Sequence, residues 1–90
     1  MAVYDHSIPK DLLAQAQGGD AEAQYLLGLF YATDEEVREN LITAHMWFNL
    51  AATAGDQRAR IERQEMAEMM SNPEVAEAQR RARAFLRAAA

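Results

Sequence analysis

The side chains of this chain that could perform chemistry are few. His6 and His45 are the only histidines, and their spacing does not form a metal-binding pair. The two serines, Ser7 and Ser71, each stand two residues before a proline, a pattern typical of helix N-caps and not of nucleophiles. There is no cysteine, which excludes disulfides and thiolate chemistry. The sequence therefore predicts no catalytic residue, no metal ligand and no cofactor, and it indicates a protein that is not an enzyme.

An acidic run is the cluster that could bind a hard cation. It consists of Asp34-Glu35-Glu36, with Glu39 close by. The run lacks the ligand spacing and the central glycine of an EF-hand loop. Carboxylates just before a helix are also stabilised by the positive end of the helix dipole. We therefore expect a solvated acidic loop, and the alternatives are a docking site for a basic partner and a metal site.

Charge is unevenly distributed along the chain. The formal net charge is −5: residues 1–45 carry eight acids against two basic residues, and residues 46–90 carry six acids against seven arginines. An acidic protein binds nucleic acid poorly, because neutralised phosphates supply most of that affinity. Four of the arginines gather near the C-terminus: Arg80, Arg81, Arg83 and Arg87. Glu77 stands one helical turn before Arg81, which favours a solvated, internally paired helix face over a patch for an acidic partner.

Hydrophobic spacing predicts an all-α fold whose helices position these side chains. We expect five helices in antiparallel pairs, at residues 8–17, 21–33, 41–54, 57–70 and 73–88. One boundary pattern, Ala-x-x-Gly-Asp-x-x-Ala, begins at Ala16 and again at Ala52, 36 residues later. In each copy the glycine would end one helix in the left-handed conformation and the aspartate would cap the next. Asn40 and Ser71 are the expected caps of the third and fifth helices.

The helix expected at residues 21–33 is apolar on two sides. One face carries Ala23, Leu26, Leu27, Phe30 and Tyr31, and the opposite side carries Tyr25, Leu29 and Ala32. Such a helix either lies between neighbouring helices or leaves one side for a ligand. Gln24, Tyr25 and Leu29 are therefore the candidate partner-binding residues, as a shallow ligand site. The alternative is that the first and fourth helices cover them.

The remaining notable side chains are expected to be structural. His45, Asn49 and Thr53 line a narrow polar stripe of the third helix, so His45 is predicted to face solvent. Trp47 is predicted to pack between helices. The methionines at helical spacing are predicted to be core residues, with an adaptable peptide-binding surface as the alternative: Met46, Met66, Met69 and Met70.

A longer pattern runs Gly19-x-x-x-Ala23-Gln24-x-x-Leu27-Gly28-x-x-Tyr31, then Ala44-x-x-Trp47-Phe48-x-x-Ala51-Ala52-x-x-Gly55. It resembles the Sel-one-like repeat (SLR), a relative of the tetratricopeptide repeat. The resemblance implies a right-handed α/α superhelix of the solenoid type, a concave groove, and a role as an adaptor or scaffold without shared catalytic residues. Where the family usually has Gly-x-Gly-Val, this chain has Asp34-Glu35-Glu36-Val37, which implies a reshaped loop.

We expect one helical-repeat domain over residues 1–90, made of a leading helix (1–18), one complete repeat (19–55) and a degenerate capping repeat (56–90). The expected function is a protein–protein interaction module that binds a protein or peptide in the groove. The alternative is a self-assembling structural protein, such as a homodimer through apolar helix faces. No signal peptide and no apolar run of membrane-spanning length is seen, so we expect a cytoplasmic location and no membrane partner. The resemblance and the preference for arginine over lysine favour a bacterial origin.

Overall fold

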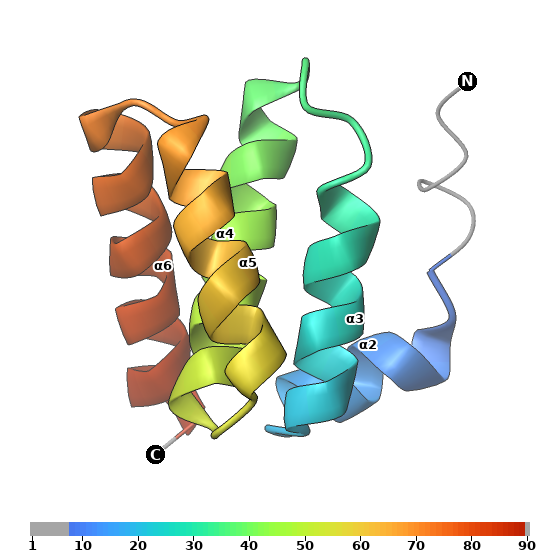
Figure 1. Ribbon diagram of the computed structural model, residues 1–90. Coiled ribbons are helices and arrows are strands. Elements are labelled where there is room, and N and C mark those ends of the chain that lie inside the picture. Colours follow the sequence, from blue (N-terminus) through green and yellow to red (C-terminus); the bar gives the residue numbers. More distant parts are fainter. Residues whose placement is uncertain (1–7, 90) are drawn as a thin grey trace.

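The computed structural model describes residues 8–89, and every regular element in that range is an α-helix. The helices are α2 (Lys10–Gln17), α3 (Ala21–Tyr31), α4 (Arg38–Thr53), α5 (Gln57–Glu68) and α6 (Asn72–Ala89). Helix α4 packs against α3, α5 and α6, and α2 packs against α3, lying across its lower end in Figure 1. The all-α prediction is confirmed, and each expected helix is present with its ends shifted by no more than three residues. The cap expected at Ser7, like His6, lies outside the described residues.

The two copies of the glycine–aspartate boundary form the same hinge. Gly19 has a φ of 101° and Gly55 a φ of 106°, the left-handed region that glycine occupies without a steric penalty. The N–H after each glycine donates to the carbonyl five residues earlier, at 3.0 Å in both copies. Each aspartate accepts a hydrogen bond from the N–H three residues later, at 2.8 Å for Asp20 and 3.2 Å for Asp56. The predicted helix stops and caps are therefore confirmed.

The buried side chains form two clusters, and α3 and α4 contribute to both. The first cluster joins α2, α3, α4 and α6 through Ala16, Ala23, Leu27, Trp47, Leu50 and Ala82. The second joins α4 and α5 through Leu41, Ala44, Phe48, Ala51, Ala59 and Met66, with Tyr25 and Leu29 of α3 packed against it. Helix α3 thus lies between neighbours on both of its apolar sides. The predicted structural role of Trp47 is confirmed: its ring meets Phe85 edge-on, with the centroids 5.7 Å apart.

The closest approach between α3 and α4 is at Gly28. A Cβ atom built on Gly28 would lie 2.9 Å from Cζ of Phe48 and closer still to Cδ1 and Cε1 of the same ring. Phe48 is fully buried, so its ring has no free space to move into. The repeat-like pattern therefore supplies both sides of this helix contact: Leu27-Gly28 on α3 and Trp47-Phe48 on α4.

The expectation that Asn40 caps the third helix is wrong. Helix α4 begins at Arg38, with Val37 at the cap position and no side-chain hydrogen bond there. Asn40 is 9% exposed inside the first turn, and its Nδ2 has no partner among the described residues. The early start has a tertiary cause, because Arg38 donates to Glu74 at the start of α6 and to the Met69 carbonyl, at 3.0 Å for the latter.

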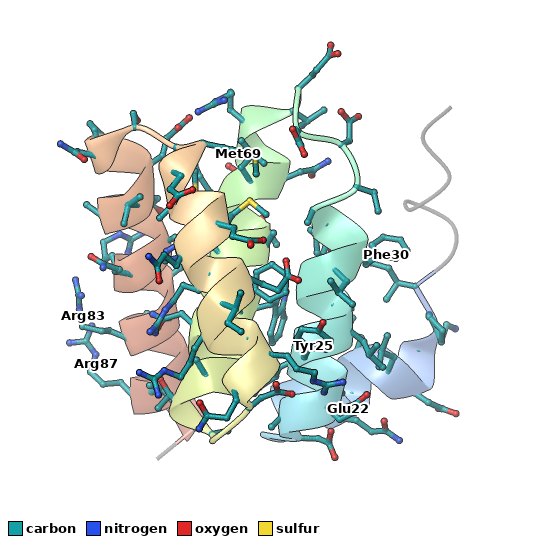
Figure 2. All side chains as sticks on the ribbon, in the orientation of Figure 1. Glu22, Tyr25, Phe30, Met69, Arg83 and Arg87 are labelled. Atoms are coloured by element: carbon teal, nitrogen blue, oxygen red, sulfur yellow. The ribbon has the colours of Figure 1, made fainter. Side chains whose placement is uncertain are left out.

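Three expectations about helix faces also need correction. Leu26 was placed on the core face but is 39% exposed, whereas Tyr25 on the opposite side is half-buried. His45 is predicted to face solvent but is only 2% exposed, because α4 is enclosed by three helices; Thr53, at the end of the same polar stripe, is exposed. Among the methionines, Met66 is buried as predicted, but Met69 is 38% exposed at the end of α5 (Figure 2).

Ion pairs hold α6 against the start of α4. Glu77 accepts from Arg80 and Arg81, each pair at 2.7 Å, so the predicted Glu77–Arg81 pair is confirmed. Arg81 reaches on to Glu39 of α4. Hydrogen bonds from the Arg80 and Arg81 guanidinium groups lower the pKa of Glu77 to about 2. At the start of α6, Ser71 is a cap as predicted: it forms a capping box with Glu74, in which the Ser71 N–H donates to Glu74 at 2.8 Å and the Ser71 hydroxyl accepts from the Glu74 N–H.

Candidate binding site

The three candidate partner-binding residues do not share one surface. Gln24 is 3% exposed, and its Nε2 donates to the Ala16 carbonyl at 3.0 Å, which ties α3 to α2. Tyr25 and Leu29 pack against the second buried cluster, between α4 and α5. The structure therefore separates Gln24 from Tyr25 and Leu29, and it gives each of them a packing contact.

Arg58 of α5 covers Tyr25. Its guanidinium carbon lies 4.0 Å from the centroid of the Tyr25 ring, which is a cation–π contact. The Tyr25 ring also lies near the Phe48 ring, with the two centroids 6.0 Å apart. Arg58 also pairs with Asp56 at 2.7 Å and with Glu22. The hydrogen bond from Arg58 lowers the pKa of Asp56. This network closes the space between the lower ends of α3 and α5, where Figure 2 shows Glu22 and Tyr25.

The outward face of α5 carries a broad, open depression of about 490 Å³. Its described lining residues all belong to α5: Gln57, Arg60, Ile61, Arg63 and Gln64. Ile61 is 62% exposed, the most exposed large apolar side chain of the described residues. Arg63 donates to Asn49 Oδ1 at 2.6 Å, which fixes the Arg63 side chain at one edge of the depression. The surface combines one apolar anchor point with guanidinium groups, which suits an apolar segment that also carries acidic residues.

A second, smaller cavity of about 190 Å³ lies where the C-terminal ends of α2, α4 and α6 meet. Its described lining is apolar or uncharged: Gln17, Gly18, Gly19, Gln24, Leu50, Thr53, Ala54, Phe85, Leu86 and Ala89. Leu50 is 2% exposed, whereas Leu86 is 46% exposed at the rim. Gln24 Oε1 is buried and has no hydrogen-bond partner within residues 8–89.

His45 is buried in its neutral form. Burial lowers its pKa, and the positive charge of Arg63 lowers it further. Its Nδ1 has no hydrogen-bond partner in the described part of the chain. The His45 side chain therefore resists protonation, and its protonation would disfavour the folded state.

The acidic run forms a turn of its own. The Glu36 N–H donates to Asp34 Oδ1 at 3.2 Å, and Glu35 and Glu36 are exposed. Across residues 8–89, no three His, Asp or Glu side chains are grouped closely enough to hold a metal ion. Over the same residues, no helix is both long enough and apolar enough to cross a bilayer.

Apart from Gln24, the residues that line the 190 Å³ cavity are not candidates in the sequence analysis. Leu50 and Leu86 come from helices that are distant in the chain, and no spacing rule joins them. The weak signal was Gln24 itself, a long polar residue next to core positions Ala23 and Leu27.

Comparison of the chain with protein-family models, with curated proteins and with solved structures gave no match.

Proposed function

We propose that this chain is a protein-interaction module built as a short right-handed α/α superhelix, in line with its resemblance to the SLR family. The observation that carries the proposal is the pair of matching hinges, Gly19-Asp20 and Gly55-Asp56, with φ values of 101° and 106° at the glycines. The same stop-and-cap geometry recurs 36 residues apart, as expected where one helical unit follows another along a solenoid. Solenoids use the surface of such stacks to bind proteins.

The proposed partner-binding surface is the outward face of α5. Tyr25 is covered by Arg58, so the groove inferred from the sequence is narrowed at that end. The face of α5 remains open, with Ile61 62% exposed next to Arg60. The proposal relies on the combination of this apolar side chain with the depression around it and with the neighbouring guanidinium groups. The partner would be a segment with one aliphatic or aromatic anchor residue flanked by Asp or Glu.

Selection from a random peptide library on the purified chain tests this proposal. We expect enriched peptides that pair an apolar residue with acidic residues and bind the wild-type protein. Ile61→Asp should weaken their binding by about tenfold or more, because it removes the apolar anchor point and repels acidic residues. The matched control is Leu26→Asp, which changes an exposed leucine (39%) on α3. Failure to enrich any peptide, or equal loss in both variants, would contradict the proposal.

Self-assembly is the second candidate function, and one observation favours it. Arg83 and Arg87 project outward from α6 in Figure 2, and neither has an ion-pair partner within residues 8–89. The exposed Glu35 and Glu36 side chains lie on the α3–α4 loop and are likewise unpaired there. Opposite charges on separate surfaces favour head-to-tail contact between copies. Light scattering after size exclusion would detect a dimer that dissociates at high salt, and a strict monomer at high concentration would exclude it.

A further inference from the structure

We infer that α5 is an acid-released helix: protonation of His45 on α4 opens the contact between α4 and α5 while the other helices stay packed. Two groups carry this inference, the buried His45 ring and the Arg63 guanidinium that α5 holds against α4. The inference goes beyond the proposed function, and its test uses the chain alone.

Helix α5 is attached to the rest of the protein by little buried apolar surface. Its buried side chains are Ala59 and Met66, and both belong to the cluster shared with α4. In Figure 1, α5 lies in front of α4. The described part of α5 contributes no side chain to the first buried cluster, which joins α2, α3, α4 and α6. A helix with few buried apolar side chains opens locally at low cost, so α5 can open while that cluster stays intact.

Arginine contacts complete the attachment of α5, and they are spread over its length: Arg58 on Tyr25, Arg63 on Asn49, and Arg38 on the Met69 carbonyl. The middle contact fixes the position of a positive charge. Arg63 donates to Asn49 Oδ1 at 2.6 Å, and Asn49 stands one helical turn after His45. The Arg63 guanidinium is therefore held on the side of α4 that carries His45.

His45 pays a penalty for protonation only while α5 is in place. The ring is 2% exposed, and Nδ1 has no hydrogen-bond partner among residues 8–89. Burial lowers the pKa of His45, and among the charged side chains of α5 it is Arg63 that lowers it further. Opening of α5 lets water reach the ring and takes the Arg63 charge away. A proton therefore binds the open form more tightly than the closed form, and acid favours opening.

The other helices packed against α4 bring no charge that reverses this effect. From α3, Tyr25 and Tyr31 pack against the cluster shared by α4 and α5, and a tyrosine is uncharged in acid. The carboxylates of α3, α4 and α6 are ion-paired with arginines: Glu22, Glu39, Glu74 and Glu77. The pairing lowers the pKa of Glu74 and of Glu77 to about 2, so these two keep their charge where histidine titrates.

A single introduced thiol reports the opening, because the chain has no cysteine of its own. Met66→Cys places the thiol in the contact between α4 and α5, and Ala59→Cys is a second probe of the same contact. Leu50→Cys places it in the first cluster instead. We would measure the rate of labelling by a dipyridyl disulfide, which reacts with thiols in acid, from about pH 7 to about pH 5. Each rate is divided by that of the same variant unfolded in urea, and the melting temperature shows that each variant is folded.

We expect labelling of the Met66→Cys and Ala59→Cys variants to accelerate by up to about tenfold for each pH unit below 6.5, the ordinary His pKa. Labelling of Leu50→Cys should stay slow. Equal acceleration of the probes in both clusters would show that acid unfolds the whole chain, and it would overturn the inference.

Three further substitutions assign the response to its groups. His45→Gln should remove the acceleration in the Met66→Cys variant, and an acceleration that survives this change would also overturn the inference. Arg63→Gln removes the positive charge beside His45 and should reduce the pH dependence. Arg60→Gln, the matched control, removes a charge from the exposed side of α5 and should leave the pH dependence unchanged. Equal effects of the Arg63 and Arg60 substitutions would contradict the role given to Arg63.

Discussion

Replacing Gly28 by alanine should destabilise this protein, although the same change stabilises an ordinary helix. Gly28 lies inside α3, where alanine has the higher helix propensity. The added methyl group, however, would stand 2.9 Å or less from three atoms of the Phe48 ring. That ring is fully buried in the cluster that contains Leu41 and Met66. Backbone and ring cannot both stay in place, so either α3 or the ring must shift.

The expected magnitude comes from two opposing terms. Alanine in place of glycine in a helix interior contributes about 1 kcal/mol of stabilisation. Overpacking a core costs about 1–3 kcal/mol, and three ring atoms nearer than 3 Å put this site at the upper end. The expected net loss is about 2 kcal/mol, which lowers the melting temperature by roughly 8–16 °C in a domain of this size.

Urea unfolding gives the free energy directly, with the buried Trp47 as the fluorescence reporter. Gly18→Ala is the matched control, because a Cβ at Gly18 makes only ordinary contact, at 3.4 Å from the Ala14 carbonyl oxygen. Phe48→Leu should cost less in the Gly28→Ala background than in the wild type, since it makes room for the methyl group. A Gly28→Ala protein as stable as the wild type, or more stable, would refute the reasoning.

Three further predictions concern the hinges and the titratable groups. Gly55→Ala should lower the free energy of unfolding in urea by roughly 1–2 kcal/mol through the left-handed backbone, whereas Gly18→Ala should not. The free energy of unfolding should fall as the pH is lowered from about 7 through the ordinary His pKa of 6.5, because buried His45 binds a proton less readily than it does in the unfolded chain. His45→Gln should flatten this dependence and His6→Gln should keep it; the reverse pattern would contradict the assignment. The folded-state pKa of Glu77 is about 2, below the ordinary value of 4.5. The stability that ionised Glu77 contributes to the folded protein should therefore be present above pH 4.5 and be lost as the pH falls from 4.5 toward 2. Glu77→Gln should reduce the acid sensitivity of the melting temperature in that window, and an unchanged profile would show that the pairs with Arg80 and Arg81 contribute nothing.

The elements whose signals are local could be predicted from the sequence. The Gly19-Asp20 and Gly55-Asp56 boundaries depend on backbone conformation and capping within a few residues, and both form as expected. The start of α4 could not be predicted in this way. Asn40 has the residue type of a cap, but Arg38 bonds Glu74, which is 36 residues away, and the helix extends to include it.

The candidate site shows the same division. Periodicity identified α3 as apolar on two sides, but it could not decide whether a neighbour or a ligand covers Tyr25. Arg58 decides this through a contact between two helices, aided by its pairs with Glu22 and Asp56. The exposure of His45 was misjudged because a helical wheel shows one helix, while the burial of α4 depends on three others.

Local residue patterns account for the helices, the two hinges, and the residue types that fit closely at Gly28 and Phe48. These follow from backbone geometry and side-chain size, which act over short distances along the chain. Which faces stay open depends on how the helices pack: Arg58 covers Tyr25, Ile61 stays exposed, and Gln24 lines the same cavity as Leu50 and Leu86. Surfaces and cavities are made by residues from separate helices, and their positions are fixed only when the helices pack.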